Sequence, residues 1–143
     1  MKIYLASSWR NLAQPGIVHI LRRIGHEVYD FKNPGPGKSG FSWSDISPEW
    51  KKWTPEQYKA ALKHPIAKEG YRSDITALNE CDACILLLPS GRSASWELGY
   101  AMGKGKKGYV LQLEEFEPEL MYSEAEFLTS IEDLFRVFGE PKE

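Results

Sequence analysis

Short apolar runs alternate with amphipathic segments along this chain, and that alternation constrains the fold most. The runs are rich in β-branched or aromatic residues, as strands are, and span Ile3–Ala6, Val28–Phe31, Ala83–Leu88 and, more weakly, Tyr109–Leu113. Helical spacing or length marks the segments 17–24, Ile66–Leu78, Ala94–Gly103 and Ser130–Phe138. Strands that alternate with helices favour a parallel sheet covered by helices on both faces. We therefore predict a three-layer, Rossmann-like α/β fold with a mostly parallel sheet of about five strands.

The length, charge and composition of the chain limit the classes of function that it can have. A chain of 143 residues is the length of one domain, and we expect a single domain over residues 1–143. Its net charge of −2 argues against a nucleic-acid partner, which would favour a basic excess. The longest apolar run, Ala83–Pro89, is too short to cross a membrane, and the first residues read as a strand rather than a signal peptide. We expect a cytoplasmic protein that binds neither nucleic acid nor membranes.

One segment does not fit the alternation. Near the start of residues 32–63, the sequence Asn-Pro-Gly-Pro-Gly at positions 33–37 excludes a helix or strand interior. Trp43, Trp50, Trp53 and Tyr58 follow, and disordered segments are poor in aromatic residues. Long ordered loops in compact domains are typically lids or binding loops. Our hypothesis is that this aromatic-rich insertion is a lid.

Ligands of open α/β sheets bind beyond the carboxyl ends of the strands. Ser7 and Ser8 follow the first strand directly, where small residues leave backbone N–H groups open to an anion or a sugar. No glycine lies between Ala6 and Pro15, so this is not a GxGxxG dinucleotide loop. A structural alternative is that Ser8 or Asn11 caps the next helix.

Two carboxylates are candidates for chemistry. Glu97 follows the most apolar strand, and we expect it in the first turn of a helix, where the helix dipole would keep it ionised. The alternative is a capping interaction with Ser95 or Ala94 at the N-cap. Asp74 neighbours the apolar face of its helix and could point toward the ligand edge, although a solvated carboxylate fits the same spacing.

Cys81 and Cys84 have the CxxC spacing of redox and zinc motifs. A thioredoxin-type motif follows a strand and opens a helix, whereas this pair ends a helix and opens a strand. The three histidines, at positions 19, 26 and 64, do not supply a second pair of zinc ligands. We expect buried structural cysteines.

Taken in order, these motifs resemble the nucleoside 2-deoxyribosyltransferase family and the related deoxynucleoside 5′-monophosphate N-glycosidases. The resemblance rests on Ile3–Trp9, on an aspartate before the third strand, on Glu97–Ala101 and on Leu120–Met121, and it covers nearly the whole chain. It implies a flavodoxin-like fold. It also implies enzymatic cleavage of an N-glycosidic bond, without a metal ion or organic cofactor.

The resemblance implies roles for individual residues. Glu97 matches the nucleophile that attacks the anomeric carbon, Tyr4 a tyrosine that positions this carboxylate, and Asp74 the acid that assists departure of the base. Trp9 matches an aromatic wall of the base pocket. Met121 matches a residue contributed by a neighbouring subunit, so the resemblance implies a homodimer or a higher homo-oligomer.

The substrate remains open between two classes. Ser8 and Arg10 match phosphate-loop residues of the monophosphate glycosidases, and Arg92 and Ser93 add donors for a 5′-phosphate. Glu119 stands where those glycosidases place a serine, and its carboxylate would repel a phosphate.

Two positions also depart from the transferase pattern. Gly91 replaces an acidic residue that lies six positions before the nucleophile, and Glu119 replaces an asparagine two positions before the methionine. We expect transfer of deoxyribose between bases. The alternatives are hydrolysis of nucleoside 5′-monophosphates, or a non-catalytic nucleotide-binding sensor.

Overall fold

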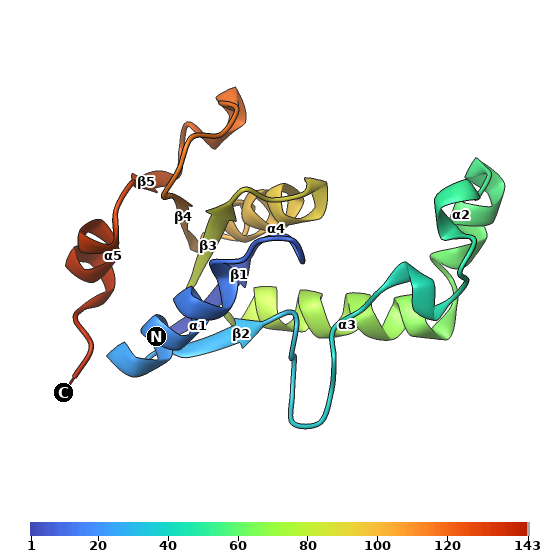
Figure 1. Cartoon of the computed structure of the whole chain (residues 1–143), viewed down its shortest axis with the longest axis horizontal. Helices are drawn as coiled ribbons and strands as arrows, with labels where there is room; N and C mark the ends of the chain where they lie inside the picture. Colours follow the sequence, from blue (N-terminus) through green and yellow to red (C-terminus); the bar gives the residue numbers. More distant parts are fainter. Residues whose placement is uncertain (143) are drawn as a thin grey trace. The chain divides into compact units, whose positions relative to one another are not determined.

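The computed structural model describes residues 1–142 and contains one five-stranded sheet (Figure 1). The strands are β1 (Lys2–Ala6), β2 (Glu27–Asp30), β3 (Ala83–Leu88), β4 (Lys107–Gln112) and β5 (Glu126–Leu128). All neighbours pair in parallel, in the order β2-β1-β3-β4-β5, which is the flavodoxin-like order. The predicted fold class is confirmed.

The helices are α1 (Gln14–Ile24), α2 (Pro55–Ala61), α3 (Pro65–Glu80), α4 (Arg92–Gly103) and α5 (Ile131–Phe138). Short 3-10 turns lie at η1 (Trp43–Asp45), η2 (Trp50–Lys52) and η3 (Leu120–Tyr122). Every strand and helix expected from the sequence is present. β5 and α2 were not predicted, because three residues at a sheet edge and a helix inside the insertion carry little periodic signal.

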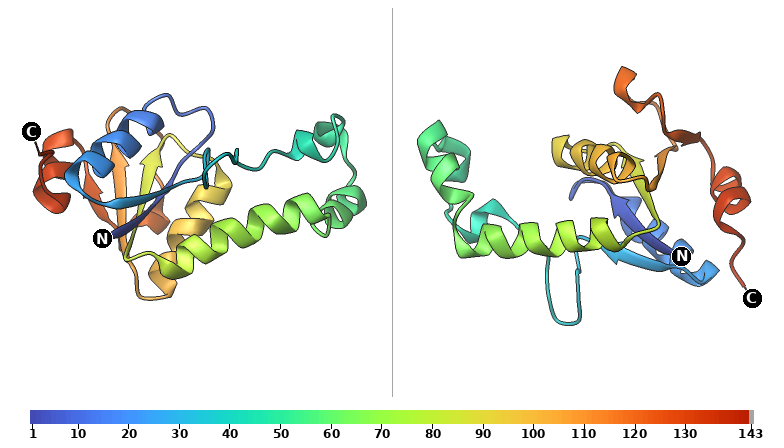
Figure 2. Two further views of the ribbon diagram at one scale, coloured as in Figure 1. Left: turned by 90° about the horizontal axis from the view of Figure 1, so that it is seen from below. Right: turned by 180° about the vertical axis from the view of Figure 1, so that it is seen from behind.

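The central position of β3 explains its apolar sequence. All six of its residues are buried, since β1 and β4 flank it and helices cover both faces of the sheet. α1 and α5 lie on one face, where Leu21 and Leu134 join a core with Leu5 and Leu87 (Figure 2). α4 covers the opposite face, and that face carries the candidate site.

α1 shows how the local sequence sets an element. A proline occupies its first turn, where a missing N–H costs nothing, and Arg22 and Arg23 lie in its last turn. Gly25 ends the helix at a φ of 116°, a conformation that favours glycine, and its N–H bonds back to carbonyls of the helix. The helix end predicted from Gly25 is confirmed.

Contacts divide the chain into two compact units. The first comprises residues 1–30 and 78–143 and contains the sheet, and the second is Phe31–Ala77. The second unit contains the expected insertion, residues 32–63, together with most of α3.

Aromatic residues organise the second unit. The ring of Trp43 makes edge contacts with Phe41, Trp53 and Tyr58, at centroid distances of 4.7, 5.8 and 5.7 Å. Phe41 also packs onto α3 at Gly70, where an added Cβ would lie 2.9 Å from the Cβ of Phe41. Trp43 and Trp53 therefore form an aromatic cluster with Phe41 and Tyr58 within this unit.

Candidate active site

The loops that follow β1 and β3 meet at the carboxyl edge of the sheet, where the strand order switches and ligands bind in open α/β folds. The hydroxyl of Ser7 donates to the carbonyl of Leu87 at 2.9 Å. The amide of Asn11 donates to the carbonyl of Pro89 at 3.1 Å. These two bonds hold the first loop against the end of β3.

Asn11 is a site-forming residue that the sequence analysis considered only as a helix cap. That interpretation is wrong: Ala13 is the N-cap of α1, and the helix has no side-chain cap. Asn11 is instead buried. Its side-chain oxygen Oδ1 accepts from the N–H of Ala13 at 2.9 Å, and its side-chain amide nitrogen donates to the carbonyl of Pro89. Ser8 does not cap α1 either, because its hydroxyl accepts from the N–H of Arg10 within the loop.

The prediction that Glu97 lies in the first turn of its helix is wrong. Gly91, in extended backbone, is the N-cap of α4, so the helix begins at Arg92 and its first turn contains no acidic residue. A capping interaction with Ser95 or Ala94 is excluded for the same reason. The influence of a helix dipole fades beyond the first turn, so it does not hold the Glu97 carboxylate.

Tyr4 holds Glu97 instead. The Tyr4 hydroxyl donates a hydrogen bond to Oε2 of Glu97. Tyr4 is fully buried in β1, whereas Glu97 is half-buried on α4. A buried phenol thus fixes one carboxylate oxygen at the switch point of the sheet.

Cys84 lies next to Tyr4 in the sheet, and the negative charge of Glu97 affects the ionisation of its thiol. Burial raises the pKa of Cys84 well above its ordinary value of 9.0, and the negative charge of Glu97 contributes to that rise. Burial also raises the pKa of Cys81. Both cysteines are buried thiols, as expected, and both are protonated at neutral pH.

The outer part of the site is open. Trp9 and Arg10 are exposed on the loop after β1, and Arg92 and Ser93 are exposed in the first turn of α4. A Cβ added to Gly91 would meet no atom within 4 Å. There is therefore free space beside Gly91, where the transferase pattern has an acidic side chain.

The loop after β4 carries Glu119 and Met121. Both are exposed, and Met121 has an exposed fraction of 88%. Tyr122 anchors this loop to α4 by a hydroxyl contact of 2.7 Å with Ser95, two residues before Glu97. Sequence reasoning did not identify Tyr122, since its partner lies on a distant helix.

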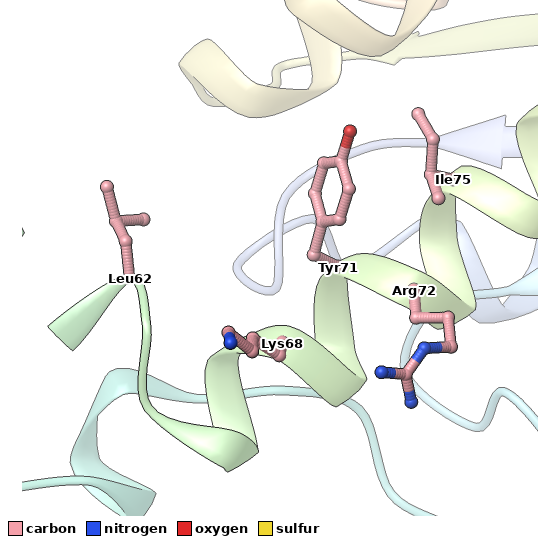
Figure 3. A pocket seen from close by; sticks show the side chains of 5 residues that line it. All are labelled: Leu62, Lys68, Tyr71, Arg72 and Ile75. Atoms are coloured by element: carbon pink, nitrogen blue, oxygen red, sulfur yellow. The ribbon is translucent and has the colours of Figure 1, made fainter.

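Asp74 belongs to the second unit and lies half-buried on α3. The same helix borders a shallow pocket lined by Leu62, Lys68, Tyr71, Arg72 and Ile75. Figure 3 shows Tyr71 and Ile75, four residues apart, on the same side of α3. The guanidinium of Arg72 is paired with Glu69 at 2.8 Å.

Within residues 1–142, no three His, Cys, Asp or Glu side chains gather closely enough to hold a metal ion. Among the same residues, no helix has the length and apolar character needed to cross a membrane.

Comparison with known proteins shows what this architecture resembles. No protein-family model matches the chain, and no curated protein matches it significantly. The structure is similar to a solved 2-deoxyribosyltransferase from Bacillus psychrosaccharolyticus, with a TM-score of 0.63. The match covers 100% of this chain and 99% of the other, at 18% sequence identity.

The chain has the deoxyribosyltransferase fold. The resemblance inferred from the sequence motifs is thereby confirmed at the level of the fold. In this fold, the Tyr4–Glu97 pair lies on the face of the sheet that α4 covers. The roles of the individual residues stay predictions.

Proposed function

We propose that this protein is an enzyme that cleaves the N-glycosidic bond of 2′-deoxynucleosides and transfers the deoxyribose to an acceptor base. The observation that carries the proposal is the hydrogen bond from Tyr4 to Glu97 at the switch point of the sheet. A hydrogen bond from a buried phenol orients a carboxylate for attack on carbon. The shared fold of a 2-deoxyribosyltransferase supports the same reading.

The proposed reaction has two displacement steps. An oxygen of the Glu97 carboxylate attacks the anomeric carbon, the C–N bond breaks, and its electron pair leaves with the base. The product is a glycosyl ester on Glu97. A nitrogen of the acceptor base then attacks the same carbon, the ester C–O bond breaks with its electron pair returning to the Glu97 carboxylate, and the proton of that nitrogen passes to the carboxylate of Asp74. Two inversions leave the anomeric carbon with its original configuration.

The leaving base needs a proton or a hydrogen-bond donor, and we assign that role to Asp74. We assign Trp9 to stacking on the base and Ser7 to shaping the loop near the sugar. In the first step Tyr4 orients Glu97, and a carboxylate beside the anomeric carbon stabilises the oxocarbenium-like charge that develops there.

Hydrolysis of nucleoside 5′-monophosphates is the second candidate. The observation that favours it is the exposed first turn of α4: Gly91 leaves the backbone N–H groups uncapped by any side chain, with Arg92 and Ser93 beside them. Together with Ser8 and Arg10, these groups could hold a phosphate. The carboxylate of Glu119, on the exposed loop after β4, would repel the negative charge of a 5′-phosphate and so disfavours this candidate.

Assembly into a homodimer or higher homo-oligomer is part of the proposal. Leu120 and Met121 have exposed fractions of 81% and 88%, which is unusual for two neighbouring large apolar residues. We propose that a second copy covers them and takes Met121 into its site. Sedimentation that shows only monomer under turnover conditions would overturn this part.

The test follows product formation by chromatography, with a deoxynucleoside or its 5′-monophosphate, with and without a second base. A new deoxynucleoside that appears only with the acceptor supports transfer, whereas free base without an acceptor supports hydrolysis. Glu97→Gln should abolish both reactions. Glu140→Gln, an exposed glutamate near the end of the chain, is the matched control.

Two outcomes contradict the proposal. One is that no substrate is consumed although nucleotides raise the melting temperature persistently, which favours the sensor alternative. The other is turnover by Glu97→Gln at the wild-type rate. Trapping supplies a further check, because quenched reactions should show a mass gain of one deoxyribosyl group on the wild type but not on Glu97→Gln.

A further inference from the structure

A row of four residues crosses the sheet on the face covered by α4. Tyr29 on β2 pairs with Tyr4 on β1, Tyr4 pairs with Cys84 on β3, and Cys84 pairs with Gly108 on β4. Side chains at paired positions of neighbouring strands share a face. Tyr4, the residue that holds Glu97, is therefore flanked by Tyr29 on one side and by Cys84 on the other.

The flank formed by Tyr29 is a ring stack. The centroids of Tyr4 and Tyr29 are 5.1 Å apart, and the rings are inclined by only 17°. Stacked aromatic pairs attract each other beyond the area they bury. The stack fixes the plane of the Tyr4 ring, and the direction of its hydroxyl follows from that plane.

The opposite flank is small and brings α4 close to the sheet. Cys84 offers a small side chain, and Gly108 offers none, so Met102 and Leu98 of α4 occupy the space above it. A Cβ at Gly108 would lie 2.4 Å from the sulfur of Met102. Neither residue can support the Tyr4 ring as a second ring can, which leaves this role to Tyr29.

We infer that Tyr29 is a positioning residue for the Tyr4–Glu97 pair, acting through its ring and not through its hydroxyl. This inference rests on the proposed function, in which Glu97 is the nucleophile. Tyr29 touches no reacting atom in this account. It restricts the rotation of Tyr4, so that the hydroxyl stays directed at Glu97 throughout the two displacement steps.

The first experiment compares three variants in the turnover assay. Tyr29→Leu removes the ring and should lower kcat by about 3- to 10-fold, the range expected for one lost stack, while KM changes by less than about twofold. Tyr29→Phe retains the ring and should restore most of the lost kcat. Phe127→Leu is the matched control, because it removes a half-exposed ring from the other edge strand, β5.

A double-mutant cycle tests whether the effect passes through Tyr4. In a Tyr4→Phe background there is no hydroxyl left to direct, so Tyr29→Leu should cause no further loss of kcat. If the two losses multiply, or if Tyr29→Phe loses as much as Tyr29→Leu, the inference is wrong. If Tyr29→Leu does not fold, Tyr29→Met replaces it in the same cycle.

A measurement without substrate separates this inference from the proposed function. Protein labelled with 3-fluorotyrosine gives a fluorine resonance for Tyr4, assigned by its loss in Tyr4→Phe. The Tyr4 signal should keep its position in Tyr29→Phe and move toward the unfolded-chain value in Tyr29→Leu. An unmoved signal overturns the inference, whereas full activity of Glu97→Gln overturns only the proposed function.

Discussion

The hydroxyl of Tyr4 and the carboxylate of Glu97 are joined by a hydrogen bond, although 93 positions separate the two residues in the chain. Tyr4 is completely buried in the sheet, and Glu97 lies on the helix that covers it. The nucleophile proposed for this protein is thus oriented by the core of the fold and not by a mobile loop.

Removal of the Tyr4 hydroxyl should impair turnover without unfolding the protein. A hydrogen bond to a charged group contributes about 1.5–3 kcal/mol, so we expect Tyr4→Phe to lower kcat by about 10- to 100-fold. Tyr100→Phe is the control, since Tyr100 lies on α4, as Glu97 does, and the variant loses a hydroxyl bond of 2.8 Å to Asn79 of α3. Equal losses in both variants would contradict the role of Tyr4.

An acidic side chain should be tolerated at Gly91. The backbone there is extended, and an added Cβ meets no atom within 4 Å. Aspartate is a better N-cap than glycine, so Gly91→Asp should raise stability by a few tenths of a kcal/mol, roughly the difference seen in helix caps. Thermal melts against Gly91→Ala check this. A lower melting temperature for the aspartate variant would show that the space is not available.

Two helical glycines should respond oppositely to alanine. A Cβ at Gly70 would lie 2.9 Å from the Cβ of Phe41, an atom close to the backbone, whereas a Cβ at Gly99 meets nothing within 4 Å. We expect Gly70→Ala to destabilise the protein by about 1–3 kcal/mol through overpacking. Gly99→Ala should stabilise it by about 0.5–1 kcal/mol. Urea unfolding measures both, and similar effects at the two sites would contradict the packing of Phe41.

Stability should depend on the ionisation of Asp133 at the start of α5. Its carboxylate accepts from the N–H of Thr129 at 2.9 Å, and this bond, assisted by Arg136, lowers the pKa of Asp133 below its ordinary value of 3.8. A lowered folded-state pKa stabilises the protein above pH 3.8, and that stabilisation is lost as the pH falls through the folded-state pKa.

Asp133→Asn should therefore have a lower melting temperature than the wild type at pH 7. The difference in melting temperature between the two proteins should become smaller under strongly acidic conditions. Thermal melts across this pH range measure the effect. Glu132→Gln, an exposed neighbour, serves as the control. A difference that stays constant with pH would contradict the assignment to the carboxylate charge.

The contact of 2.7 Å between Ser95 and Tyr122 should restrain the loop that carries Glu119 and Met121. Without it, we expect faster amide exchange over residues 113–122 in Tyr122→Phe, and the same change in Ser95→Ala. Hydrogen exchange read by mass spectrometry resolves this segment. Exchange that is unchanged in both variants would show that other contacts hold the loop.

Local sequence patterns predict most of the sheet. The uninterrupted apolar run Ala83–Leu88 predicts a strand buried on both faces, and the alternation of strands with helices predicts a parallel order. Gly25 marked the end of α1 correctly, since only the left-handed conformation at that position ends the helix as observed. These features depend on local periodicity and local backbone preference, which neighbouring residues encode.

Tertiary structure decided how the site is held. Because α4 begins at Arg92, Glu97 lies beyond the first turn of the helix. The hydroxyl of Tyr4, which is distant in sequence, therefore orients the Glu97 carboxylate, and the helix dipole does not. Asn11 read as a helix cap in sequence, but it joins two loops 78 positions apart. The Tyr4–Tyr29 stack exists because β1 and β2 pair in one particular register. Such contacts join residues far apart in the chain, so no local pattern records them, and only the packing of the sheet creates them.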